Sequence, residues 1–179
     1  AGGKSLLLGA LMNSQGRLYA FDVSEKRLSN MKPRFKRSGL SNLHAQRITH
    51  ENDIKVRRLI GKIDRVLVDA PCSGLGTLRR NPDLKWRQSP QSIQELTAKQ
   101  TAILSAAASL LKPGGRLVYA TCSFLPEENQ EIIHHFLATH PQFTLLNCTE
   151  LLSQQKIALN TGEFLQLSPQ LHQTDGFFA

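Results

Sequence analysis

The segment from residue 64 to residue 87 constrains the fold of this chain more than any other. Its apolar run, residues 65–68, is short and rich in β-branched side chains, which favours a buried strand over a helix. Asp69 and Pro71 end that strand, because proline has no N–H group to donate to a sheet ladder. Ligands of open α/β sheets bind beyond the carboxyl ends of the strands. We therefore expect Asp69 and Cys72 at the mouth of a pocket.

A second strand with the same design follows about fifty residues later. Residues 116–123 form an apolar run that ends at Cys122, and both Cys72 and Cys122 are followed by a serine. A free cysteine is often only a small apolar residue of the core. Two of them at the ends of two predicted strands instead favour one shared site.

The rest of the chain alternates between the two kinds of secondary structure. We predict helices at residues 6–12, 25–37 (bent or broken near Pro33), 54–60 and 89–111, and from Pro126 to about residue 139. We predict further strands at residues 17–22, 43–48, 143–146 and 164–167, with another beginning at residues 175–179. This alternation predicts one doubly wound α/β domain.

A glycine-rich start and two acids are candidates for ligand binding. The residues Ala1, Gly2, Gly3 and Lys4 enter a predicted helix, where glycines allow close approach and the helix N-terminus offers free N–H groups. A Walker-type phosphate loop also ends in Gly-Lys-Ser, but its other glycine would precede the first residue. Asp22 ends the next strand about twenty residues later, the spacing of a ribose-binding acid. Asp53 lies in a polar segment that could contact an adenine or only turn the chain.

Charge points to a polyanionic partner. The 179 residues carry a formal net charge of +8, and four basic residues directly follow the Cys72 loop: Arg79, Arg80, Lys85 and Arg87. Such clustering is the electrostatic pattern of nucleic-acid binding, although it does not separate RNA from DNA.

Cysteine spacing and hydropathy exclude several other classes. The three cysteines are widely spaced and odd in number, which argues against a zinc site or a disulfide framework. No apolar run approaches the roughly 20 residues that a bilayer requires, and no secretory signal opens the chain. We therefore expect no metal and no membrane association, and a cytoplasmic location.

These motifs together resemble the RsmB/Sun family of RNA 5-methylcytosine methyltransferases. Residues 1–4 look like the end of its cofactor loop, residues 69–74 (Asp-Ala-Pro-Cys-Ser-Gly) like its fourth motif, residues 120–123 (Ala-Thr-Cys-Ser) like its sixth, and residues 175–178 like its closing motif. The resemblance implies a Rossmann-like, doubly wound sheet of the class I methyltransferase type, mostly parallel with an antiparallel strand near the C-terminus. It also implies that residues 1–179 are a single, incomplete catalytic domain that lacks the first strand and the N-terminal RNA-binding regions, with the last strand cut.

The resemblance implies a function for each candidate residue. S-adenosylmethionine would be the cofactor, bound by Ala1, Gly2, Gly3, Lys4, Asp22, Asp53 and Asp69. Cys122 would add to C6 of a cytosine, Cys72 would assist product release, and Asp69 would hold the cytosine edge. The substrate would be RNA, with ribosomal RNA preferred over transfer RNA as the expected class, and Arg79, Arg80 and Lys85 would bind it.

Three alternatives stay open. A DNA cytosine-5 methyltransferase would use Cys72 as the nucleophile, usually with glutamine in place of Ser73. An amino-group methyltransferase would have Asp/Asn-Pro-Pro-aromatic at residues 69–72 and no use for Cys122. A basic RNA-binding module with a degenerate cofactor pocket would not bind the cofactor.

Overall fold

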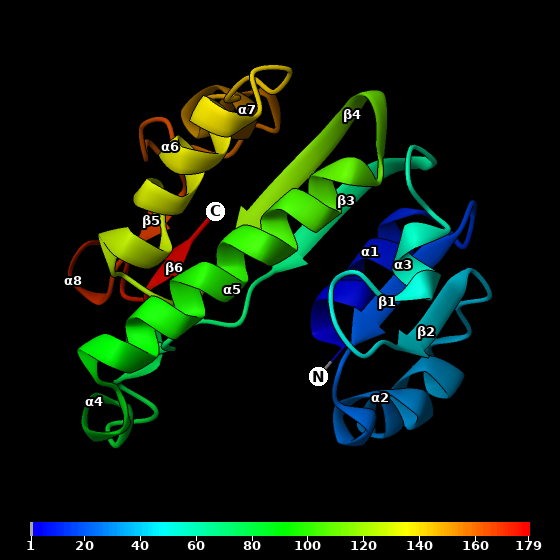
Figure 1. Ribbon diagram of the computed structural model, residues 1–179, viewed down its shortest axis with the longest axis horizontal. Coiled ribbons are helices and arrows are strands. Elements are labelled where there is room, and N and C mark those ends of the chain that lie inside the picture. Colours follow the sequence, from blue (N-terminus) through cyan, green and yellow to red (C-terminus); the bar gives the residue numbers. More distant parts are fainter. Residues whose placement is uncertain (1) are drawn as a thin grey trace. The chain divides into compact units, whose positions relative to one another are not determined.

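The computed structural model describes residues 2–179 and divides the chain into two compact units. The first unit is Ala1–Arg58 and the second is Leu59–Ala179. Each is described by itself below, with the element labels of Figure 1.

The first unit is a parallel strand pair with packed helices. Its elements are α1 (Gly3–Leu11), β1 (Leu18–Asp22), α2 (Glu25–Ser38), β2 (Leu43–Arg47) and α3 (Ile54–Arg57). β1 and β2 are parallel, and both α1 and α2 contact β1. The Ser24 side chain accepts a hydrogen bond from the backbone N–H of Arg27 and so caps α2.

Pro33 does not break α2, which excludes one of the two predicted alternatives, a bent or a broken helix. The helix is continuous from Glu25 to Ser38 with Pro33 inside it. Proline removes one backbone hydrogen bond, but Leu28 and Met31 are buried on the inner side of this helix. Tertiary packing of an apolar face, which is the main source of helix stability in proteins, offsets that loss.

The second unit is built around another parallel pair. Its strands are β3 (Ile63–Asp69), β4 (Leu111–Ala120), β5 (Gln166–Leu167) and β6 (Phe177–Phe178), and its helices are α4 (Leu84–Arg87), α5 (Pro90–Ser109), α6 (Gln130–Thr139), α7 (Cys148–Gln154) and α8 (Pro169–His172). Two 3₁₀ turns, η1 (Leu75–Thr77) and η2 (Pro126–Glu128), complete it. Figure 1 shows α5 lying along the β3–β4 pair. This helix contacts both strands and also α6.

The second unit has a parallel strand pair and, near the C-terminus, an antiparallel pair. β3 pairs with β4 so that Asp69 lies opposite Ala120. β6 pairs with β5 in antiparallel fashion, and Phe178 also exchanges two backbone hydrogen bonds of 3.0 Å with Thr121, just beyond β4. The C-terminal strand therefore closes against the end of β4, as the sequence predicted for an antiparallel strand near this terminus.

The core of this unit is the predicted apolar face of α5 packed on the strands. Leu104 of α5 and Phe178 of β6 are each 1% exposed, and Tyr119 of β4 packs edge-on against Phe178. Ser89 caps α5 in a reciprocal arrangement with Ser92. The predicted helix at residues 89–111 is thus confirmed as a core element.

Two other predictions need correction. Residues 143–146 form no strand: Phe143 packs edge-on against Phe136 of α6, with ring centroids 5.2 Å apart, while Leu145 and Leu146 are exposed. A short apolar run does not by itself distinguish a strand from a packed loop. The helix predicted from Pro126 begins as the 3₁₀ turn η2, and α6 follows at Gln130.

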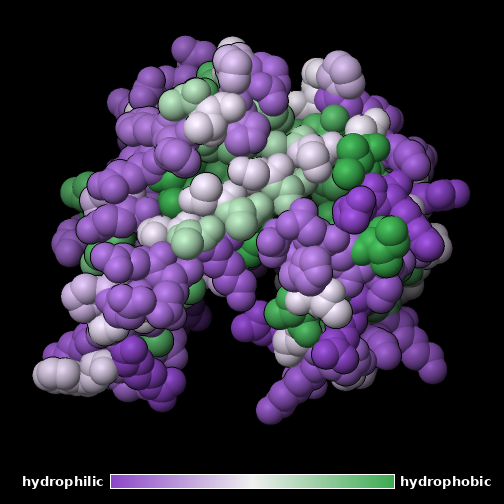
Figure 2. Space-filling view, viewed as in Figure 1, coloured by the Kyte–Doolittle hydropathy of each residue, from purple (hydrophilic) through white to green (hydrophobic). Residues whose placement is uncertain are grey.

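The face of the molecule seen in Figure 2 is mostly polar. Figure 2 shows hydrophilic residues over most of the visible face, with a pale, weakly hydrophobic band along α5. Within residues 2–179, no helix has both the length and the apolar character needed to cross a bilayer.

Candidate active site

Two cysteine sulfurs meet where β3 and β4 end. The parallel register places Asp69 beside Ala120, and the backbone N–H of Ala70 donates to the carbonyl of Ala120 at 2.9 Å. Three residues after Asp69 and two after Ala120, the Sγ atoms of Cys72 and Cys122 lie 3.4 Å apart. Neither cysteine forms a disulfide, and both are partly buried. The structure thus brings together the two cysteines that the sequence placed at neighbouring strand ends.

Glycine at position 76 allows the Cys72 loop to approach the Cys122 loop closely. The N–H of Gly76 donates to the carbonyl of Cys122 at 2.9 Å, and the N–H of Gly176 donates to the carbonyl of Gly76 at 2.7 Å. A Cβ atom on Gly76 would lie 2.4 Å from the Gly176 oxygen and 2.7 Å from the Cys122 oxygen. Only glycine fits there, because real Cβ contacts are not this short.

A buried polar network lies beneath the two loops. Its members are Ser73, Gln100, Thr121, Ser123, Glu128 and Asn129, each at most 3% exposed. Ser73 and Ser123, the residues after the two cysteines, are joined by a hydrogen bond of 3.2 Å between their hydroxyl oxygens. The network therefore connects the Cys72 loop directly to the Cys122 loop.

The close contact of the two sulfurs disfavours ionisation of Cys72. The hydrogen bond with Cys122, then burial and the charge of Cys122, raise the pKa of the Cys72 thiol far above its usual range. Burial, helped by the charges of Glu128 and Cys72, also raises the pKa of the nearby Tyr119 hydroxyl. Either sulfur can donate in the contact between Cys72 and Cys122, so the pair can share one proton when the other is lost.

Asp69 is the last residue of β3 and is exposed at the strand end, on the same short segment as Cys72. A carboxylate here can accept hydrogen bonds from a ligand that reaches the thiols. The predicted grouping of Asp69, Cys72 and Cys122 at adjacent strand ends matches the arrangement in the second unit.

Two predicted cofactor positions in the first unit have suitable chemistry. Gly2 precedes α1 with φ 88°, a conformation that favours glycine, and a Cβ atom there would lie 2.8 Å from the Cγ of Met31. Asp22 ends β1, and its Oδ1 accepts the N–H of Ser24 at 2.8 Å, while Oδ2 lies 3.5 Å from Nη1 of Arg27. Gly3 and Lys4 begin α1, and Ala1 lies outside the described residues.

Asp53 has a structural task in its own loop. It caps α3: Oδ1 accepts the N–H of Lys55 at 2.9 Å, and Oδ2 accepts the N–H and the hydroxyl of Thr49. The backbone hydrogen bonds from Lys55 and Thr49 lower the pKa of Asp53 to about 2. Its predicted contact with the cofactor stays a prediction.

The predicted RNA-binding residues lie in and just before a short helix, α4, attached to the Cys72 loop. Arg79 is exposed, Arg80 forms a salt bridge with Asp175, and the Nζ of Lys85 lies 4.7 Å from the ring of Trp86. The sequence analysis did not single out Trp86, which is 81% exposed on α4.

The helix α4 contacts the Cys72 loop at both of its ends. The Nε2 of Gln88 donates to the carbonyl of Ser73 at 3.0 Å, and Leu84 lies against Gly74, where a Cβ would be 3.2 Å from it. Trp86 therefore projects from a segment that is held beside Cys72.

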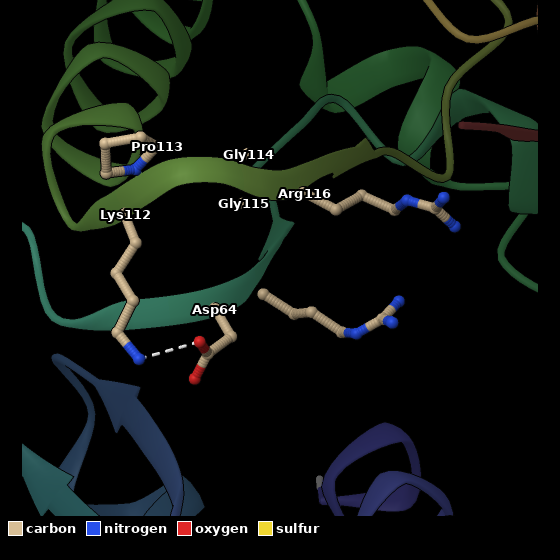
Figure 3. Close-up of a pocket in the computed structure, with 7 residues that line it drawn as sticks. Asp64, Lys112, Pro113, Gly114, Gly115 and Arg116 are labelled. Carbon is tan, nitrogen blue, oxygen red and sulfur yellow. Dashed lines mark hydrogen bonds and ion pairs between the residues drawn. The ribbon is translucent and has the colours of Figure 1, made fainter.

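A cavity at the other end of β3 and β4 contains none of the predicted site residues. It measures about 250 Å³ and lies where β4 begins, away from the cysteines, and Figure 3 shows Lys112 and Asp64 paired beside it. Its lining consists of Asp64, Arg65, Lys112, Pro113, Gly114, Gly115 and Arg116. The converging thiols, not this cavity, define the candidate active site.

Sequence reasoning missed the residue at the centre of the buried network. The sequence suggests Glu128 as an acid in the first turn of a surface helix, but its side chain is fully buried. A signal was available: Ile132 and Phe136 form the buried side of α6, and Glu128 precedes them at the same spacing of four residues.

Comparison with solved structures establishes the class. The chain superimposes on PH0851 with a TM-score of 0.86 and 35% identity, covering 98% of this chain and 39% of that one. NSun6 from Pyrococcus horikoshii with SFG matches with a TM-score of 0.82 and 29% identity over 99% of this chain and 44% of that one. The fold is the Rossmann-like fold of class I methyltransferases, as the sequence predicted.

The sequence comparisons then identify the family. The model of the family described as 16S rRNA methyltransferase RsmB/F matches residues 1–179, and the chain belongs to this family. A relative from Synechocystis sp., named as a probable ribosomal RNA small subunit methyltransferase B, is 39% identical over 99% of this chain and 40% of its own length. The chain thus spans about two fifths of the length of the curated relatives it matches.

Proposed function

We propose that this protein transfers a methyl group from S-adenosylmethionine to C5 of a cytosine in RNA, with ribosomal RNA as the expected substrate, through a covalent adduct with Cys122. One observation carries the proposal: the sulfurs of two cysteines, neither in a disulfide, lie 3.4 Å apart at adjacent strand ends. The ribosomal RNA methyltransferase names of the relatives support RNA as the substrate.

The need for a thiol follows from the chemistry of cytosine. C5 is too weak a nucleophile to be methylated directly, and addition of a thiolate to C6 makes C5 nucleophilic. In this proposal the Cys122 sulfur bonds to C6, and its release, with loss of the C5 proton to a base, restores the aromatic ring. The Asp69 carboxylate holds the polar edge of the base.

Cys72 acts on the Cys122 sulfur. Because its pKa is raised, it holds a proton beside that sulfur, 3.4 Å away. A hydrogen bond from Cys72 stabilises the Cys122 thiolate before attack and again when the thiolate leaves the product. The assignment of Cys122 as the nucleophile and of Cys72 as the residue that assists release follows the resemblance to the family.

The first unit offers groups suited to the cofactor. S-adenosylmethionine would supply an electrophilic methyl group on a sulfonium. The Asp22 carboxylate at the end of β1 is of the type that accepts hydrogen bonds from ribose hydroxyls. Gly2, in the left-handed conformation before α1, has no side chain and so lets the backbone approach a ligand closely. Gly3, Lys4 and Asp53 complete the proposed set in this unit, and Asp69 of the second unit is a predicted cofactor residue as well.

The segment from η1 to α4 would bind the RNA. Arg79, Arg80 and Lys85 supply positive charge for phosphates, and Trp86 offers an exposed ring on which an unstacked base can stack. A target cytosine must leave its stack to reach the thiols, which looped or single-stranded RNA permits at low cost.

The test is adduct formation with RNA that contains 5-azacytidine, using the full-length protein with S-adenosylmethionine. Wild type and Cys72→Ala should form a covalent adduct and Cys122→Ala should not. Cys148→Ala is the matched control, because that thiol lies near the carbonyl of Ala179, away from the pair. Loss of the adduct only in Cys72→Ala would support the mechanism of a DNA cytosine-5 methyltransferase. No adduct from wild type on the RNAs of the small ribosomal subunit, with no cofactor binding, would support a degenerate RNA-binding module.

A further inference from the structure

Glu128 is a buried carboxylate behind the two cysteine loops. It ends η2, its side chain is 0% exposed, and no Lys, Arg or His of residues 2–179 forms an ion pair with it. Burying a carboxylate without a cation is costly unless hydrogen bonds replace its hydration. Its hydrogen bonds therefore indicate what the residue holds in place.

All three side-chain hydrogen bonds of Glu128 lead to the Cys72 loop. Oε1 accepts from the backbone N–H of Ser73 at 2.8 Å and from Nε2 of Gln100 at 3.0 Å, and Oε2 accepts from the Ser73 hydroxyl at 2.5 Å. The same Gln100 nitrogen donates to the carbonyl of Pro71 at 2.9 Å. Residues on both sides of Cys72 are thus fixed from one carboxylate.

The hydroxyl groups of Ser73 and Ser123 connect Glu128 to the Cys122 loop, and these hydroxyls can donate in one direction only. A carboxylate accepts and does not donate, so the Ser73 hydroxyl must donate to Glu128. In the 3.2 Å contact between the two serines, Ser123 must then be the donor. The Ser123 oxygen in turn accepts the N–H of Leu125 at 3.1 Å. Every hydrogen of this chain points toward Glu128.

The next residue, Asn129, fixes the other side of the pair. Its Nδ2 donates to the carbonyl of Ser123 at 3.0 Å, and its Oδ1 accepts from the Thr121 hydroxyl at 2.5 Å. Glu128 and Asn129 together therefore bracket both cysteines, at residues 71–73 and 121–123.

We propose that Glu128 is a positioning residue, which sets the spacing of the Cys72 and Cys122 sulfurs through the ordered hydroxyls of Ser73 and Ser123. Glu128 does not touch the substrate in this account. Its effect on the reaction rests on the proposed function, whereas its effect on the thiols does not.

The substitution Glu128→Gln tests the ordering with little change of volume. If the amide oxygen takes the place of Oε1, the amide NH₂ replaces Oε2 and faces the Ser73 hydroxyl. Ser73 must then accept and turn its hydrogen toward Ser123, which reverses the chain. If the amide is turned over, its NH₂ instead faces the donors from Ser73 and Gln100. Either way the contacts that hold the two loops are disturbed while the shape is retained.

The experiment measures two quantities in the full-length protein. The first is the rate at which iodoacetamide alkylates Cys72 and Cys122, resolved by peptide mapping, with Cys148 as the internal reference. The second is kcat and KM for methyl transfer to RNA. The variants are Glu128→Gln, Ser73→Ala, the double variant, and Glu127→Gln as the control, which removes the charge of an exposed neighbour.

We expect Glu128→Gln to change the alkylation rates of Cys72 and Cys122 but not that of Cys148. We also expect kcat to fall about 10- to 100-fold, the effect of misplacing reacting groups, with KM unchanged. The Glu128→Gln effect should shrink in the Ser73→Ala background, because coupled residues are not additive. Glu127→Gln should match wild type.

Three results would overturn the proposal: equal behaviour of Glu128→Gln and Glu127→Gln, full additivity with Ser73→Ala, or a lower melting temperature with unchanged alkylation rates and kcat. If Glu128→Gln does not fold, Ser123→Ala interrupts the same chain without touching the carboxylate and must give the same alkylation change. If wild type methylates no RNA, the proposed function fails, while the alkylation results still decide the role of Glu128.

Discussion

Replacing Gly76 with alanine should displace the Cys122 loop by a predictable amount. The new Cβ would lie 2.4 Å from the Gly176 oxygen and 2.7 Å from the Cys122 oxygen, whereas ordinary contacts begin at 3.4 Å. The Gly176 oxygen must therefore move by about 1 Å and the Cys122 oxygen by about 0.7 Å, since overpacked sites relax by backbone shifts. Neither neighbour is the flexible end of a side chain, so backbone must move.

We expect two consequences of this movement. Overpacking of this kind costs about 1–3 kcal/mol of the free energy of unfolding. A misplacement near 1 Å can also slow a reaction by about 100-fold. Urea denaturation measures the first effect, and the rate of adduct formation with 5-azacytidine RNA measures the second, both in the full-length protein.

Gly61→Ala separates the two effects. Gly61 has φ 66° and open space around its Cα, so alanine there introduces backbone strain of about 1 kcal/mol without a new contact. It should lower stability comparably and leave the adduct rate unchanged. If Gly76→Ala formed the adduct at the wild-type rate, as Gly61→Ala should, the close approach of the two loops would not position Cys122.

Three further predictions follow from the same geometry. Diamide should oxidise the Cys72–Cys122 pair to an intramolecular disulfide, which should block methyl transfer and be reversed by dithiothreitol. Peptide mapping that finds these cysteines only in disulfides with other thiols would contradict the 3.4 Å spacing. Trp86→Ala should weaken RNA binding about 5- to 150-fold, the cost of losing one stacked base, while Trp86→Phe retains most of it; a lower melting temperature with unchanged affinity would instead show that the ring packs within the protein. The Asp53 carboxyl has a lowered pKa, so it stabilises the fold above its ordinary pKa of 3.8, and this contribution is lost as the pH falls toward about 2; NMR titration of Asp53 should give that value, and Asp53→Asn should remove this part of the acid sensitivity.

Local sequence patterns were sufficient to locate the strand ends and the thiols. The β3 and β4 strands are apolar runs closed by Pro71 and by Cys122, and parallel pairing then brings their carboxyl ends together without further information. The apolar spacing of α5 likewise predicted a core helix, which Leu104 confirms.

Features that depend on distant packing could not be read locally. The acid Glu128 looked like an ordinary helix-start residue, because its burial depends on Ser73 and Gln100, far away in the sequence. The run at residues 143–146 has the composition of a strand, but Phe143 packs on α6 instead. Pro33 would break an isolated helix, and only the buried side of α2 keeps it continuous.

The closing contacts near the C-terminus also impose an order on biosynthesis. The N–H of Gly176 donates to the carbonyl of Gly76, Asp175 forms a salt bridge with Arg80, and Phe178 exchanges backbone hydrogen bonds with Thr121. The Cys72 loop is therefore held by residues about a hundred positions later in the chain. Contacts this far apart form late, because a long loop must close first. During translation the two cysteines are therefore synthesised well before residues 175–178, and the contacts of those residues with both cysteine loops can form only after they have left the ribosome.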